Sequence, residues 1–174
     1  NNMKNDVKNS FSDRLIKKTR ELGNPICMGL DPNPNLIPKI FKNKNSSVTI
    51  SNIENFLSEI LELAVGKVVA IKPQVAFFEQ LGPEGMSLLI KISRMAHNSD
   101  LLVIMDAKRG DIESSSKAYA DAWIGRNATF PSDALTVNPW MGLDTLKPFI
   151  EVASKNKSGI FILLRTSNEG ASDL

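Results

Sequence analysis

Cysteine and histidine are almost missing from this sequence of 174 residues, which has one of each. A single cysteine, Cys27, cannot form an internal disulfide, and its apolar neighbours predict a small buried side chain. The single histidine, His97, falls near the end of an expected helix, where we expect a solvated side chain. One histidine also argues against a hydrolase that depends on histidine and against a histidine-rich metal site.

Long hydrophobic runs and an excess of charge are missing as well. No stretch approaches the roughly 18 consecutive apolar residues of a membrane span, and no secretory signal is visible. The net charge of +2 argues against a nucleic-acid or membrane-surface role driven by bulk electrostatics. With 42% hydrophobic and 23% charged residues, the composition is that of a soluble globular protein. A reducing cytoplasm is its simplest location.

A glycine-rich phosphate loop of the G-x-G-x-x-G or Walker type is also absent after the first expected strand. The sequence instead alternates short apolar runs with helical patterns. Near-continuous apolar strands are typical of a parallel sheet covered on both faces, and the alternation favours a doubly wound sheet or a (β/α)8 barrel. The pattern predicts strands at residues 26–30, 68–71, 101–105, 134–137 and 160–164, and helices at residues 12–22, 51–64, 85–96, 112–126 and 143–155.

Ionisable or polar residues follow each expected strand. A barrel brings all strand ends to one rim, whereas an open sheet spreads them apart, so we expect an α/β fold of the TIM (β/α)8 type. Such a barrel needs about 250 residues. We therefore expect residues 11–174 to form an incomplete barrel of about the first five strand–helix units, and residues 1–10 to be disordered or a leader. The polar residues at the strand ends are Asp31, Lys72, Asp106 with Lys108, Asn138 and Ser167.

The stretch from Leu101 to Ser116 has the most conspicuous strand end. Its apolar run stops at Asp106, and Lys108 and Asp111 follow within five residues. Because strand side chains alternate between faces, Asp106 and Lys108 should point the same way. The spacing predicts two carboxylates flanking one lysine at the carboxyl end of a buried strand, where α/β enzymes place their chemistry. The alternative is a strand cap with a surface ion pair.

Five motifs follow one another along the chain at the ends of the expected strands. They are Gly29-Leu30-Asp31-Pro32, Ala70-Ile71-Lys72-Pro73-Gln74, Asp106-Ala107-Lys108-Arg109-Gly110-Asp111-Ile112, the stretch 136–142 (TVNPWMG) and Arg165-Thr166-Ser167-Asn168. In this order they resemble the bacterial-type branch of the orotidine 5′-monophosphate decarboxylase family, and the third, the most specific, resembles the family's D-x-K-x-x-D-I motif. The resemblance covers the chain from about Phe11 and corresponds to the N-terminal two-thirds of the family's barrel.

The resemblance implies decarboxylation of orotidine 5′-monophosphate to uridine 5′-monophosphate in de novo pyrimidine biosynthesis, without metal or cofactor. Lys108 would protonate C6 of the pyrimidine, and Asp106 would lie beside the substrate carboxylate. Lys72 would bridge the aspartates and a ribose hydroxyl. Asp31 would also bind ribose, and Ser167 would contact the amide edge of the pyrimidine.

The resemblance also implies a homodimer. Asp111 would reach across the interface into the partner's active site, together with Ile112 and Ser115. Two positions depart from the family pattern: Glu113 stands where a small residue or proline is usual, and Ser115 replaces a threonine but keeps the hydroxyl. The elements of strands 7 and 8, where such barrels commonly bind phosphate, are not in this sequence.

Two alternatives stay open on the sequence. One is a Mg²⁺-dependent sugar-phosphate decarboxylase or synthase of the same superfamily. These enzymes share the D-x-K-x-x-D strand but typically carry glutamate at the second strand end, where this chain has Lys72. The other is a non-catalytic barrel fragment that acts as an interaction protein.

Overall fold

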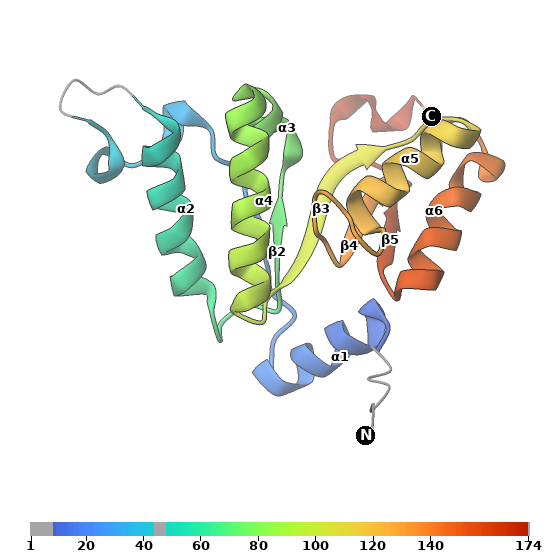
Figure 1. Ribbon diagram of the computed structural model, residues 1–174, viewed down its shortest axis with the longest axis horizontal. Coiled ribbons are helices and arrows are strands. Elements are labelled where there is room, and N and C mark those ends of the chain that lie inside the picture. Colours follow the sequence, from blue (N-terminus) through green and yellow to red (C-terminus); the bar gives the residue numbers. More distant parts are fainter. Residues whose placement is uncertain (1–8, 44–47, 174) are drawn as a thin grey trace.

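The computed structural model describes residues 9–43 and 48–173 (Figure 1), so most of the expected leader, residues 1–8, lies outside the described residues. Helices and strands alternate as the sequence predicts. The helices are α1 (Phe11–Leu22), α2 (Ile50–Ala64), α3 (Val75–Glu79), α4 (Gly82–Asn98), α5 (Glu113–Ile124) and α6 (Leu143–Asn156), and the strands are β1 (Cys27–Leu30), β2 (Ala70–Pro73), β3 (Leu102–Arg109), β4 (Ala134–Val137) and β5 (Gly159–Ile162). Short 3-10 turns occur at Pro34–Leu36, Lys39–Phe41 and Glu169–Ser172.

The five strands form one parallel sheet in the order β1-β2-β3-β4-β5. Strand order therefore follows chain order, as in a (β/α)8 barrel, whereas a doubly wound sheet reverses direction at a switch point. In Figure 1, α2 and α4 lie alongside one end of the sheet and α5 and α6 alongside the other. The expected five strand–helix units of a barrel are confirmed.

The main core lies between the sheet and its outer layer of helices. Alternate strand residues face this layer, because side chains in a strand point to opposite sides. Fully buried strand residues here pack with apolar residues of α2, α4, α5 and α6. Examples from the two sides are Ile71, Val103, Met105, Leu135, Leu57, Leu89, Ile124 and Phe149.

The opposite, concave face of the sheet is filled at its amino end by α1. This helix begins at a capping box between Ser10 and Asp13. Its first residue, Phe11, packs in a second buried cluster with Ala70 and Ile104. Phe11 also fits closely over β5, where a Cβ added to Gly159 would lie 2.4 Å from the Phe11 ring. Helix α1 therefore plugs the amino end of the strands, which lies at the bottom of Figure 1.

The expectation that Cys27 is buried is wrong, because the residue is exposed. Its side chain belongs to the concave face of β1, where it lines a hollow of about 380 Å³ together with Lys72 and Phe161. An apolar neighbourhood in sequence predicted burial, but the apolar neighbours of a strand residue point to the other face.

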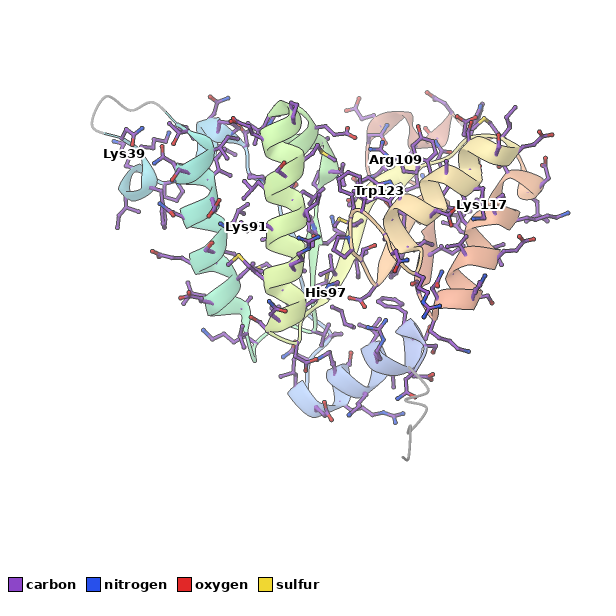
Figure 2. The ribbon with its side chains drawn as sticks, in the orientation of Figure 1. Lys39, Lys91, His97, Arg109, Lys117 and Trp123 are labelled. Carbon is purple, nitrogen blue, oxygen red and sulfur yellow. The ribbon has the colours of Figure 1, made fainter. Side chains whose placement is uncertain are left out.

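His97 lies in the last turn of α4 and is exposed, as the sequence predicted, but its ring also has a charged partner. Its Nε2 lies 2.9 Å from Oδ2 of Asp133, and Figure 2 shows it at the end of α4 nearest α1. The Arg14 guanidinium of α1 lies 2.5 Å from the other oxygen of Asp133, and the backbone N–H of Val103 donates to Oδ2 at 2.8 Å. One carboxylate thus joins α1, α4 and the start of β3.

The Asp133 side chain is 6% exposed. Burial by itself raises the pKa of such a carboxyl, but the contacts with His97, Val103 and Arg14 outweigh burial and lower the pKa to about 2. The ionised form of Asp133 therefore stabilises the folded protein.

Two helix boundaries differ from the expectation for local reasons. Helix α4 begins at Gly82 rather than at residue 85, because Pro83 occupies the first turn, where its missing N–H costs nothing. Helix α3 was not predicted, since its five residues are too short for a helical period to show. Within the described residues, no helix has the length and apolar character needed to cross a membrane.

Replacing Asp133 by asparagine should lower the free energy of unfolding by about 2 kcal/mol at pH 7, measured by urea denaturation. The folded-state pKa of about 2 lies below the ordinary value of 3.8, so this contribution is complete above about pH 4 and is lost as the pH falls through about 2. The difference between the two proteins should therefore shrink by roughly half at pH 3. The control Asp121→Asn removes an exposed pair with Lys117 and should change little. An undiminished difference at pH 3 would contradict the assigned pKa.

Candidate active site

The carboxyl ends of β2 and β3 bring two lysines onto one aspartate. Lys72 Nζ lies 2.8 Å from Oδ2 of Asp106, and Lys108 Nζ lies 2.5 Å from Oδ1. The Asp106 side chain is 10% exposed. The expectation that Asp106 and Lys108 point the same way is confirmed, and the contacts exclude a simple surface ion pair.

Two further side chains complete the surroundings of Asp106. Gln74 Nε2 donates to Oδ2 at 3.1 Å, and the hydroxyl of Thr136 on β4 lies 3.1 Å from Oδ1. The sequence placed both residues in motifs but gave neither a role at the aspartate. The sequence could have predicted both contacts, because Gln74 and Thr136 lie at the carboxyl ends of the strands on either side of β3, and the ends of parallel strands meet at one edge of the sheet.

The electrostatics of the site keep Asp106 ionised. Burial by itself raises the pKa of this carboxyl, but hydrogen bonds from Lys108 and Lys72 and the charges of the two ammonium groups outweigh burial and lower the pKa below its ordinary value. The result is a fixed array of alternating charge, with both ammonium groups held by one carboxylate.

Strand β3 is irregular where it carries these residues. Met105 pairs with Leu135 and Arg109 pairs with Val137, so the three residues between Met105 and Arg109 oppose one residue of β4. Within this bulge, Lys108 has a φ of 49°, in the left-handed region that a non-glycine residue rarely adopts. Bulges are frequent beside active sites, where they redirect a side chain.

Arg109 ties the end of β3 to the helices. Its guanidinium is paired with Glu79 of α3 and lies 5.6 Å and 5.4 Å from the ring centroids of Tyr119 and Trp123 of α5. Figure 2 shows Arg109 and Trp123 close together near the carboxyl end of the strands. Contacts with two helices fix the residue that follows Lys108.

Asp111, by contrast, is not part of the charge array. Its carboxylate accepts a hydrogen bond from the next backbone N–H, that of Ile112, at 2.7 Å, and within residues 9–43 and 48–173 it forms no ion pair with either lysine. Of the two carboxylates that the spacing predicts beside Lys108, Asp106 contacts its ammonium and the Asp111 of the same chain does not. Ile112 and Ser115 are exposed, and the hydroxyl that bonds the Asp111 backbone is that of Ser116.

Asp31 and Ser167 lie toward opposite edges of the sheet. Asp31 is exposed directly after β1, and Ser167 is exposed in the segment after β5. The neighbours of Ser167, Thr166 and Asn168, line a hollow of about 500 Å³ with Trp140. The structure thus places both residues on the rim that carries Lys72 and Lys108, with β2, β3 and β4 between them.

Fold and site together define a (β/α)8-type protein with a lysine–aspartate–lysine array at the carboxyl ends of its strands. Residues 24–174 match the model of the "Orotidine 5'-phosphate decarboxylase / HUMPS family". The chain belongs to this family, as its motifs suggested.

Named relatives agree with the family model. The chain is 40% identical to the orotidine 5′-phosphate decarboxylase of Rhodopirellula baltica over 92% of its length and 38% identical to that of Streptomyces coelicolor over 91%. It superposes with a TM-score of 0.86 and 36% identity on a crystal structure of a candidate orotidine 5′-phosphate decarboxylase from Streptomyces avermitilis, covering 95% of this chain and 56% of that one. The chain spans about half the length of these curated relatives, namely 56% and 55%.

Glu113, one of the two departures from the family pattern, has a φ of 42° at the start of α5. A left-handed conformation costs a non-glycine residue roughly 1–2 kcal/mol, and glycine avoids this cost at the expense of about 0.5–1 kcal/mol of chain entropy. Glu113→Gly should therefore raise the free energy of unfolding by about 0.5 kcal/mol, seen as a higher thermal midpoint.

Glu113→Ala is the control for this experiment, because it removes the charge but keeps a side chain in the left-handed region. It should not stabilise the protein. Equal stabilisation by alanine and glycine would assign the effect to the charge and not to the backbone.

Proposed function

We propose that the protein decarboxylates orotidine 5′-monophosphate to uridine 5′-monophosphate and that Lys108 is its proton donor. The observation that carries the proposal is the contact of Lys108 Nζ with Asp106, at 2.5 Å, beside the second ammonium of Lys72. The identity to named decarboxylases supports the same reaction.

The chemistry requires a fixed positive charge. Loss of carbon dioxide from C6 leaves an electron pair in an sp² orbital that the pyrimidine ring delocalises poorly. An ammonium about 4 Å away stabilises that charge by roughly 4 kcal/mol at an effective dielectric of about 20. Because Asp106 already holds Lys108 in place, little reorganisation accompanies the reaction, and the same ammonium then delivers its proton to C6.

Asp106 has two roles in this proposal. Its lowered pKa keeps it negatively charged, so it orients both lysines. Placed beside the substrate carboxylate, the same charge favours departure of carbon dioxide, because the negative charge of the carboxylate then moves onto C6, away from Asp106 and toward the Lys108 ammonium. Lys72 bridges Asp106 and a ribose hydroxyl, Asp31 binds ribose, and Ser167 contacts the pyrimidine.

The contacts of Asp106 favour this reaction over that of a Mg²⁺-dependent sugar-phosphate enzyme. Both oxygens of the carboxylate are already engaged by ammonium groups, one from Lys72 and one from Lys108. A divalent cation would have to displace one of these ammonium groups from its oxygen. Turnover that persists in excess EDTA supports the metal-independent reaction.

A homodimer is part of the proposal. Ile112 is 56% exposed beside Asp111, and Trp140 and Leu164, 71% and 99% exposed, line one hollow on the same rim. A second copy that covers this apolar surface would receive Asp111, Ile112 and Ser115 at its own active site. A reducing compartment, the cytoplasm, suits a chain whose cysteine is free.

Lys108→Ala should reduce decarboxylation by at least about a thousandfold while circular dichroism shows an intact fold, since about 4 kcal/mol of stabilisation corresponds to that factor. The assay follows conversion of orotidine 5′-monophosphate by absorbance. Lys117→Ala, which removes an exposed lysine of α5, is the control and should keep full activity. Substantial turnover by Lys108→Ala would overturn the assignment. An inactive wild-type chain would favour the non-catalytic alternative.

Mixed dimers test the role of Asp111. Lys108→Ala and Asp111→Ala should each be inactive alone. After exchange of subunits, about half of the molecules are heterodimers with one site that has both residues, so roughly a quarter of wild-type activity per mixed protein should return. No recovery, with exchange shown by mass-tagged subunits, would place Asp111 in its own subunit's site.

A further inference from the structure

The bulge in β3 interrupts the regular pairing with β4 at the backbone N–H of Lys108. Asp106, Ala107 and Lys108 face the single residue Thr136 between the paired positions Met105–Leu135 and Arg109–Val137. A bulge of this kind interrupts the ladder of backbone hydrogen bonds. The amide of Lys108 therefore has to find its acceptor in a side chain.

The hydroxyl of Thr136 is that acceptor. The backbone N–H of Lys108 donates to Thr136 Oγ1 at 2.9 Å. The hydroxyl has one hydrogen to give, and two acceptors lie in range: Oδ1 of Asp106 at 3.1 Å and the carbonyl oxygen of Met105 at 3.4 Å. One oxygen atom thus contacts the residue before the bulge, the first residue in it and the last.

These contacts determine where the Lys108 side chain points. The residue has a φ of 49°, which a lysine adopts only when its surroundings impose it. The hydroxyl fixes the backbone N–H of Lys108 and contacts the same carboxylate oxygen, Oδ1, that holds the Lys108 ammonium at 2.5 Å. Thr136 Oγ1 of β4 therefore holds the backbone of Lys108 directly and its ammonium indirectly, through Asp106 Oδ1.

We propose that Thr136 is a positioning residue: its hydroxyl takes the place of a strand hydrogen bond and so aims the Lys108 ammonium at Asp106. The catalytic consequence rests on the proposed decarboxylation, whereas the geometric consequence does not. Removal of the hydroxyl frees the Lys108 amide, relaxes the left-handed backbone and lets the ammonium leave Oδ1. Lys72 reaches the other oxygen of Asp106 from β2 and stays in place.

Thr136→Val tests the proposal, because valine keeps the shape of threonine and lacks only the hydroxyl. Thr136→Ser is its matched control, since serine restores the oxygen. Hydrogen exchange of the Lys108 amide, followed by NMR, should be about tenfold faster in the valine variant, the order expected for loss of one hydrogen bond, and near wild type in the serine variant. The amides of Asp133 and Asn138, bonded to Val103 and Arg109 on either side of the bulge, report the intact strand pair and should not change.

A second measurement follows the ammonium itself. Acetic anhydride at limiting concentration should acetylate Lys108 severalfold faster in Thr136→Val, quantified by mass spectrometry against exposed Lys117 in the same sample. The acetylation rate of Lys72 should stay constant. This result would distinguish a changed orientation of the Lys108 side chain from a general opening of the site. Equal rates at Lys108 in both proteins would overturn the proposal.

Turnover separates this proposal from the proposed function. If both hold, Thr136→Val lowers kcat about tenfold or more with a small change in KM, and Thr136→Ser restores kcat. If the wild-type chain shows no turnover, the proposed function fails, and the exchange and acetylation rates still decide whether Thr136 positions Lys108. A normal kcat in Thr136→Val together with fast exchange and acetylation would show that the orientation of the Lys108 side chain does not limit the reaction. This outcome would overturn only the catalytic consequence of the proposal.

Discussion

The carboxylate of Asp106, shared by two ammonium groups, is the interaction on which the functional end of the molecule depends. It lies in the carboxyl-terminal half of a buried strand, where an unpaired charge would cost several kcal/mol, and the lysines of two different strands offset that cost. Gln74 and Thr136 satisfy its remaining lone pairs. The parallel order of β2, β3 and β4 is what brings these four side chains to one carboxylate.

The strand order and the meeting of Lys72, Asp106 and Lys108 followed from the sequence because both depend on periodic signals. Consecutive apolar positions in strands and the period of the helices predicted the five units, and alternation along β3 predicted that Asp106 and Lys108 share a face. The family resemblance came from motifs at the ends of those strands. Such signals are local, since each needs only the residues of one segment.

What the sequence did not reveal depends on contacts between distant segments. The exposure of Cys27 and the contact of His97 with Asp133 were missed, because both depend on segments far away in the sequence that no local pattern encodes. The bulge was missed because the charged residues after Met105 indicated a strand end, although the backbone continues to Arg109. Spacing alone predicted Asp111 beside Lys108, whereas in this chain its carboxylate accepts a hydrogen bond from the backbone N–H of Ile112.

Asp133 before β4 and Asp106 on β3 are both buried and stand at opposite ends of the same strand pair, and among the described residues they share no hydrogen-bond partner. One ties α1 to the sheet, and the other orients the lysines. Substitutions at the rim can therefore accumulate without weakening the anchor at the amino end. A lineage of such chains can therefore change the residues of this rim and still inherit the architecture, so survival of the fold in a relative says little about whether that relative has kept the charge array.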